Sequence, residues 1–237
     1  MKSPLELIAI WIALRSSVKF GVPLSQWERV CGRRRKRLWD KQNQHPGDRL
    51  RLFRAVGKVV APEAVFYAGS YVDVAPSFVF PDVTYVDMDR RAKSFFEDEE
   101  GVRQIIEAQG SAPPNRLFSF IYSDNAKLTL PEQSFDLLIS LHAEFISEYC
   151  TDFLRIGGHL LVNPSCGDAA LASIDERYRL AGVVVSQSGD YRVSQAHLVD
   201  YLQPKKPVDT TRELLFSTRR GVAYTRSAFA YVFERVA

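Results

Sequence analysis

The chain has 237 residues, of which 46% are hydrophobic and 25% are charged, and its formal net charge is +3. This composition is ordinary for a globular protein and excludes the collagen-like and intrinsically disordered classes. The length suits one large domain, or one domain with an appendage. A net charge this small does not by itself indicate a polyanionic partner.

Three widely spaced cysteines, Cys31, Cys150 and Cys166, form neither a disulfide framework nor a zinc-ligand pattern. We therefore expect a reducing, cytoplasmic setting and no bound metal. The apolar run over residues 5–14 contains Glu6 and is far shorter than the roughly 20 residues that a membrane-spanning helix needs. It predicts a helix that faces the core, and no membrane partner.

The first sixty residues have a helical pattern. Helical spacing of apolar residues predicts a helix from Pro4 to just before Gly21, a second from Ser25, and a third that begins near Pro46 to Asp48 and includes Val60. These helices precede the first expected strand. Residues 1–60 are therefore expected to form a helical cap or flank on a sheet that residues 61–237 build.

From Glu63 onward, short apolar runs alternate with helical segments. We expect strands over residues 64–69, 83–87, 117–124, 134–141 and 159–163, with two more within 182–187 and 223–236. The helices expected between them cover 76–80, 90–110 and 144–156, the last ending at a Gly157-Gly158 turn. This alternation predicts the α/β class: a doubly wound, mostly parallel seven-stranded sheet with an antiparallel C-terminal strand.

Gly69 follows the first expected strand, and Asp87 ends the second. In a parallel sheet the ligand crevice lies beyond the carboxyl ends of the strands, so the glycine and the acid converge there. A glycine permits close backbone approach, and a carboxylate can accept two hydrogen bonds from a vicinal diol. The pair predicts a cradle for a nucleotide-like ligand. The alternative for Asp87 is a helix N-cap, a role for which Asp89 is the better placed of the two.

Three stretches of this part resemble class I S-adenosylmethionine-dependent methyltransferases, from about Glu63 to the C-terminus. They are VTYVDMD at 83–89, FIYSDNAKLTLPEQSFDLLISL at 120–141, and LRIGGHLLV at 154–162. The resemblance implies a Rossmann-like fold and S-adenosylmethionine as the cofactor. It places the ribose at Asp87 and adenine beside Met88 and Asp124. The cofactor-binding residues it implies are Gly69, Ser70, Asp73, Asp87, Met88, Asp124, Asn125 and Ser140.

The glycine-rich first motif of that family is poorly matched. Only Gly69 is retained, while Tyr67 stands at the position of the acid and Tyr71 and Asp73 at those of the other two glycines. These side chains would narrow the ligand space or reroute the loop. The sequence thus leaves open an unusual cofactor pose, a different ligand, or no ligand. Asp73 suits an ion pair with the charged end of the cofactor and suits an Asx turn equally well.

His142 and Glu144 follow the fourth expected strand, where the family lines its methyl-transfer site. An imidazole titrates near neutral pH, so His142 is a candidate general base and Glu144 a candidate catalytic partner. The alternative is that this segment simply starts a helix whose dipole Glu144 complements. We expect a small-molecule methyl acceptor.

A basic cluster within the second expected helix offers another kind of partner. It consists of Arg33, Arg34, Arg35, Lys36 and Arg37, and Trp27 and Trp39 flank it. Such residues suit RNA or DNA, which implies a nucleic-acid-directed methyltransferase as one alternative. A solvated helix face with tryptophans in the core is the simpler interpretation. A degenerate, non-catalytic binding module is the other alternative, favoured by the incomplete first motif.

Overall fold

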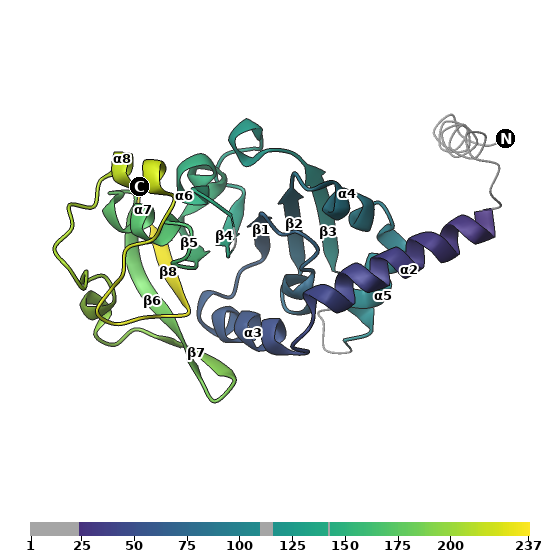
Figure 1. Cartoon of the computed structure of the whole chain (residues 1–237), viewed down its shortest axis with the longest axis horizontal. Helices are drawn as coiled ribbons and strands as arrows, with labels where there is room; N and C mark the ends of the chain where they lie inside the picture. The colour runs from purple at the N-terminus through teal and green to yellow at the C-terminus, as the bar shows by residue number, and fades with distance from the viewer. Residues whose placement is uncertain (1–23, 110–115, 142) are drawn as a thin grey trace.

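The computed structural model describes residues 24–109, 116–141 and 143–237. In this part of the chain, eight strands form one sheet in the order β3-β2-β1-β4-β5-β8-β6-β7 (Figure 1). The strands are β1 (Ala64–Ala68), β2 (Asp82–Asp87), β3 (Leu117–Tyr122), β4 (Phe135–Ser140), β5 (Leu154–Val162), β6 (Tyr178–Gln187), β7 (Asp190–Ser194) and β8 (Ala230–Arg235).

The pairing of the strands confirms the predicted fold class. Strands β1 to β5 pair in parallel, and β8 inserts antiparallel between β5 and β6. The order 3-2-1-4-5 reverses direction between β1 and β4, as in doubly wound folds. The sheet has one strand more than predicted, because β6 and β7 form a hairpin. Its turn residues Ser188 and Gly189 both have positive φ, 54° and 79°, a pattern that primed hairpin turns require.

The described helices are mostly where their sequence patterns predict them. The N-terminal flank supplies α2 (Leu24–Gln42) and α3 (Asp48–Val60), and the segment between β2 and β3 supplies α4 (Arg90–Phe96) and α5 (Glu99–Glu107). The first predicted helix, from Pro4, lies outside the described residues. The remaining α-helices are α6 (Ile146–Tyr149), α7 (Asp168–Ile174) and α8 (Arg212–Thr218), and sequence patterns did not predict the last two.

The helix predicted over residues 144–156 is wrong. Only the single turn of α6 forms there, followed by a 3-10 turn at Thr151–Phe153, and β5 begins at once. The Gly157-Gly158 pair is not a turn before the strand but an irregularity within it, since the register with β4 shifts at this point. A Cβ on Gly158 would lie 2.9 Å from the carbonyl oxygen of Arg155. The glycines therefore permit a bulge in the sheet.

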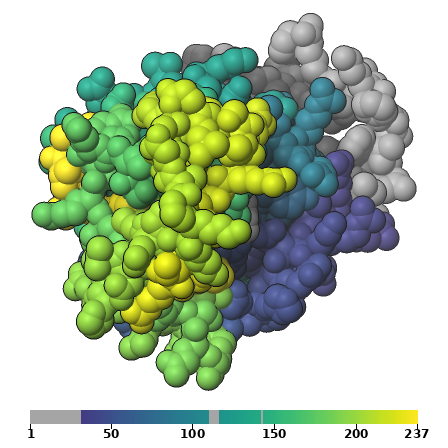
Figure 2. All heavy atoms as spheres, turned by 60° about the vertical axis from the view of Figure 1, so that its left-hand side comes forward, coloured from purple at the N-terminus to yellow at the C-terminus, as the bar shows by residue number. Residues whose placement is uncertain are grey.

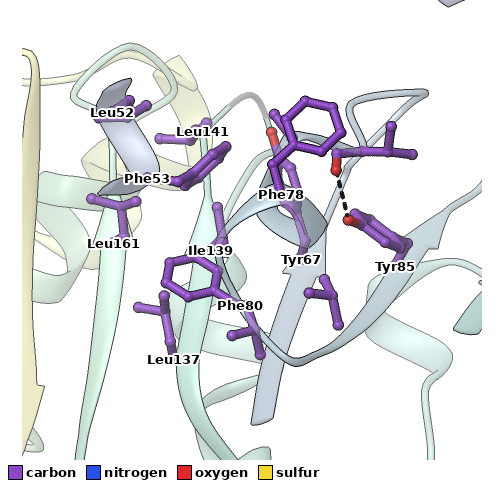
Figure 3. Packing of buried hydrophobic residues seen from close by; sticks show 14 of the residues in the cluster. Leu52, Phe53, Tyr67, Phe78, Phe80, Tyr85, Leu137, Ile139, Leu141 and Leu161 are labelled. Atoms are coloured by element: carbon purple, nitrogen blue, oxygen red, sulfur yellow. Dashed lines mark hydrogen bonds between the residues drawn. The ribbon is translucent and has the colours of Figure 1, made fainter. Parts of the chain in front are cut away.

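Both faces of the sheet are covered. Along β1, Val65 and Tyr67 belong to one buried cluster, and Phe66 and Ala68 belong to another on the opposite face. Figure 3 shows the first cluster, in which Tyr67 lies beside residues of α3 such as Phe53. Alternating side chains of one strand thus enter two different cores, which explains why the strands are apolar along their whole length.

The described part of the N-terminal flank is packed onto this sheet. Leu52, Phe53 and Val56 of α3 are fully buried in the first cluster, and the hydroxyl of Tyr191 in β7 donates to the carboxylate of Asp48 over 3.0 Å. The boundary near residue 60 remains a prediction. Among the described residues, no helix combines the length and the apolar character that crossing a membrane requires.

Candidate ligand-binding site

A cavity of about 420 Å³ lies at the carboxyl ends of β1, β2 and β4. This is the edge at which the strand order reverses, the usual place of ligands in open α/β sheets. Its volume is within the range of small-molecule sites. The residues lining it are Gly69, Asp87, Met88, Asp124, Asn125, Ala143, Glu144, Phe145, Tyr149, Phe216 and Arg219.

A second cavity, of about 360 Å³, is built wholly by the C-terminal segment between residues 205 and 223. Figure 2 shows this yellow-green segment spread over one face of the molecule. The second cavity involves no strand end, and none of the residues that the sequence singled out lines it. The cavity at the strand ends is therefore the candidate site.

Most of the predicted site residues come together there, although they are distant in sequence. Gly69, Asp87, Met88, Asp124, Asn125 and Glu144 all line the cavity. Ser70, Asp73 and Ser140 are not among the lining residues. His142 lies outside the described residues.

Asp87 lines the cavity, and its carboxylate also accepts hydrogen bonds from two backbone amides. Its Oδ2 accepts a hydrogen bond from the amide of Tyr71 over 2.7 Å, and its Oδ1 accepts one from the amide of Asp89, also over 2.7 Å. Each carboxylate oxygen has a second lone pair, so two acceptor positions remain for a ligand. Asp89 itself caps α4 by accepting from the amide of Arg91, which confirms the prediction that Asp89 is the better placed helix cap.

The end of β3 contributes an acceptor that lacks a donor. Asp124 caps the short 3-10 helix Asn125–Lys127 by accepting from the amide of Ala126. The Oδ1 atom of Asn125 is buried and has no hydrogen-bond partner among the described residues. Leaving a buried acceptor unsatisfied is costly, so this atom suits a donor supplied by a ligand, such as the amino group of adenine. Met88 beside it is 65% exposed and offers an apolar surface.

Asp73 lies in a closed network and is only 1% exposed. It accepts from the hydroxyl of Tyr67 over 3.2 Å and from the amide of Ala75 over 3.1 Å, and it pairs with Arg49 of α3 at 3.4 Å. Burial raises the pKa of Asp73, and the Arg49 guanidinium opposes that rise. The predicted contact of Asp73 with the ligand is thus replaced by contacts within the protein.

Tyr67 is the hydrogen-bond donor to Asp73 within this network. Burial raises the pKa of its hydroxyl, which keeps the side chain neutral as a donor to Asp73. Tyrosine and aspartate stand at an acid position and a glycine position of the family motif, and they bond to each other. Because both residues differ from the motif, the sequence could have indicated this hydrogen bond, but only if the two positions were considered together.

Ser140 belongs to a second internal network, centred on Asp168. Its hydroxyl donates to Asp168 over 2.6 Å, and the amides of Ile146 and Ser147 donate to the same carboxylate over 3.1 and 3.0 Å. Asp168 is 1% exposed, and burial raises its pKa against the effect of these hydrogen bonds. This residue, which sequence reasoning missed, fastens the loop after β4 that supplies one wall of the cavity.

Gly69 allows a close approach, but between two parts of the protein. It has φ +63°, and a Cβ built on it would lie 2.5 Å from the Cβ of Ala143. The end of β1 therefore touches the loop after β4 at the floor of the cavity. Next to it, Ser70 is 2% exposed, and its hydroxyl has no hydrogen-bond partner among the described residues.

The cavity wall opposite β2 and β3 is completed by α8. Phe216 packs against Phe145 with ring centroids 4.3 Å apart, and Arg219 pairs with Glu144 at 3.2 Å. Sequence reasoning missed Phe216 and Arg219, because it placed no helix in this segment. The Thr211 hydroxyl that caps α8 is the local signal for this helix.

No residue of the basic cluster lines the cavity, and two of its side chains pair with carboxylates of the protein. Arg35 forms an ion pair with Asp98, and Lys36 pairs with Asp40 at 3.0 Å. Trp39 packs edge-on against Phe78 at 5.9 Å, which agrees with a core contact. The side chains of Arg33, Arg34 and Arg37 are exposed. Binding of nucleic acid by this cluster stays a prediction.

The residues present fit an adenosine ligand at one end of the cavity. Asp87 retains acceptor positions, Asn125 offers an unsatisfied oxygen, and Met88 offers an apolar surface. The other end departs from the family pattern, since Asp73 is sealed and Tyr67 is paired with it. A ligand's distal group must therefore be held by other residues.

No protein-family model matches the sequence, and no curated protein matches it. Solved structures with a similar arrangement include the tRNA (m1A58) methyltransferase TrmI of Aquifex aeolicus, with 14% identity and a TM-score of 0.42 over 78% of this chain and 68% of that one. An rRNA methylase of Streptococcus thermophilus has 12% identity and a TM-score of 0.41 over 78% and 95%.

A protein of Methanococcus maripaludis assigned as an S-adenosylmethionine-dependent methyltransferase has 13% identity and a TM-score of 0.40. The match covers 53% of this chain and only 60% of the length of that protein. The strand order and the single antiparallel insertion, rather than these scores, identify the Rossmann-like fold of the chain.

Proposed function

We propose that the chain is an S-adenosylmethionine-dependent methyltransferase whose acceptor is a small molecule of unidentified structure. The observation that carries the proposal is the convergence of Gly69, Asp87, Met88, Asp124 and Asn125 on one cavity at the reversal of the strand order. They are residues that the resemblance to the family assigns to the cofactor.

Each of these residues has a defined task in this proposal. Asp87 accepts hydrogen bonds from the ribose hydroxyls, Asn125 accepts one from the adenine amino group, and Met88 packs against the base. S-adenosylmethionine, when bound, supplies an activated methyl group on a sulfonium. Because that group is already reactive, the chain contributes mainly by aligning the acceptor and excluding water. Phe145 and Phe216 provide the apolar wall that keeps water out.

General-base catalysis falls to His142 in this proposal. In the sequence it comes two residues after the end of β4 and directly before the cavity residues Ala143 and Glu144. Glu144 was expected to share this role, but its carboxylate is engaged by Arg219. Since Arg219 occupies the Glu144 carboxylate, we assign proton removal from the acceptor to His142 alone.

Calorimetric titration with S-adenosylhomocysteine tests the cofactor site, with Asp87→Ala and Asp89→Ala as a matched pair. Both variants remove a carboxylate from the same turn, but only Asp87 lines the cavity. Loss of one good charged partner corresponds to about a tenfold weaker affinity, which we expect for Asp87→Ala alone. Equal affinities for both variants, or no binding to the wild-type protein at millimolar ligand, would contradict the proposal.

A non-catalytic binding module is the second candidate, and the sealed network around Asp73 favours it. In such a module the cavity would still hold the nucleoside. The two functions are distinguished by adding labelled S-adenosylmethionine to the protein and a cell extract. Only the enzyme should transfer the labelled methyl group into the small-molecule, RNA or protein fraction. Transfer that His142→Ala abolishes without weakening ligand binding supports the enzyme, whereas binding without any transfer supports the module.

A further inference from the structure

The cavity extends across four neighbouring strands. In the order β3-β2-β1-β4, Asp124 follows β3, Asp87 ends β2, Gly69 follows β1, and Glu144 lies in the loop after β4. Neighbouring strands are about 4.8 Å apart, so the first and last of these positions are separated by roughly 14 Å. The cavity therefore suits an elongated ligand with one end over β2 and β3 and the other over β4.

The end over β4 carries a pair of opposite charges. Arg219 Nη1 and Glu144 Oε2 are 3.2 Å apart, and the two side chains are 69% and 42% exposed. Arg219 is the only cation among the described residues that line the cavity. A guanidinium beside a carboxylate is complementary to an α-amino acid zwitterion, since arginine binds a carboxylate through a two-donor fork and glutamate accepts from an ammonium group.

The backbone around this pair is held in uncommon conformations. Phe145, next to Glu144, has φ 56°, and Arg219 itself has φ 51°. Arg219 caps the C-terminus of α8, where the left-handed conformation is common, and Phe145 caps the N-terminus of α6. Here Leu215, which is 1% exposed, anchors α8, and the amide of Arg219 donates to its carbonyl over 2.9 Å.

Further contacts fix the two segments relative to each other. Asp168 holds the amides of Ile146 and Ser147, directly after Phe145. Behind Arg219, the loop lies so close to the turn after β5 that a Cβ on Gly221 would be 1.9 Å from the carbonyl oxygen of Pro164. The backbone that carries both side chains is thus packed against the rest of the protein.

The acid expected to bind a ligand's ammonium group is unavailable. Asp73 is sealed by Tyr67 and Arg49, and the carboxylates that line the cavity are those of Asp87, Asp124 and Glu144. Asp87 and Asp124 lie at the adenosine end. Glu144 is therefore the carboxylate at the distal end, and Arg219 is its cationic partner.

We infer that Glu144 and Arg219 bind the amino-acid end of the ligand, Glu144 through the α-ammonium group and Arg219 through the α-carboxylate. This assignment rests on the proposed function. In this assignment, Glu144 from the loop after β4 and Arg219 at the end of α8 take the place that Asp73, buried within the protein, was expected to have.

Two nucleosides that differ only at the distal end test the assignment. S-adenosylhomocysteine carries the amino-acid group, and 5′-methylthioadenosine lacks it. We expect the wild-type protein to bind S-adenosylhomocysteine at least about tenfold more tightly. Arg219→Gln and Glu144→Gln should each remove most of this preference while leaving the affinity for 5′-methylthioadenosine unchanged, as measured by calorimetry.

Arg226→Gln is the matched control, because Arg226 lies in the same C-terminal segment but pairs with Asp200 outside the cavity. Its ligand preference should equal that of the wild type. If the wild-type protein binds both nucleosides equally, the assignment is wrong and the proposed function stands. If neither nucleoside binds, both are wrong. If Arg219→Gln weakens both ligands equally, the pair supports the fold and the assignment is again wrong.

Discussion

Asp73, in the segment that joins β1 to β2, and Asp87, the last residue of β2, lie in different surroundings. Asp87 lines the cavity and keeps acceptor positions that the protein's own hydrogen bonds do not occupy. Asp73 is enclosed by Tyr67 and Arg49 and is 1% exposed. Of these two acids, one therefore remains available at the cavity, and the other is committed to contacts within the protein.

The largest loss of stability should come from removing the buried carboxylate of Asp73. Breaking a buried ion pair by removing one partner typically costs 3–5 kcal/mol, and partial exposure of Arg49 lowers this to roughly 3 kcal/mol for Asp73→Ala. Asp73→Asn, which keeps an acceptor for Tyr67, should lose less. Urea denaturation gives the free energy of unfolding. If Asp73→Ala instead abolished nucleoside binding at unchanged stability, Asp73 would be a ligand contact and the comparison would fail.

A smaller loss of stability is expected at Gly69, which follows β1 and precedes both acids. Gly69→Ala places a Cβ against that of Ala143 and forces a side chain into positive φ, at a cost of about 1–3 kcal/mol. The double variant Gly69→Ala/Ala143→Gly relieves the contact but not the backbone conformation, so it should recover part of the loss in the same denaturation measurement. No recovery would mean that the close approach to Ala143 has no energetic importance.

The smallest effect should be confined to binding. Met88 is 65% exposed, so Met88→Ala should leave the free energy of unfolding within about 0.5 kcal/mol of the wild type. Loss of its apolar contact with the base should weaken both nucleosides by about two- to fivefold. Val199→Ala, at a residue 78% exposed and remote from the lining residues, is the control. Weakening of only one nucleoside would place Met88 away from the base.

The sheet and the convergence of Asp87 and Asp124 on one cavity were predictable because their signals are local. Apolar runs that alternate with helices specify the strands, and an acid at the end of a strand lies at a predictable edge of the sheet. Asp87 and Asp124 occupy such positions. The helix predicted over 144–156 failed because a glycine pair that resembles a turn in sequence allows a bulge within β5.

The pairing of Arg219 with Glu144 was not predictable, for a different reason. Arg219 meets Glu144 only after the chain has formed three more strands and α8, and nothing near either residue in sequence indicates the other. Arg49 likewise reaches Asp73 from a helix that precedes the sheet. Such ion pairs form only when distant segments pack together, whereas sequence patterns reflect interactions between residues of one helix or strand.

The contact between α3 and the β6–β7 hairpin has a consequence for how the chain folds. The Asp48–Tyr191 hydrogen bond joins residues 143 positions apart, and Arg51 donates to the carbonyl of Gly189 across the same interface. Contacts so distant in sequence form slowly, because a long loop must close before they contribute any stability. During synthesis the helix emerges long before its partner. We therefore expect α3 to complete its docking late, only after the hairpin has been made.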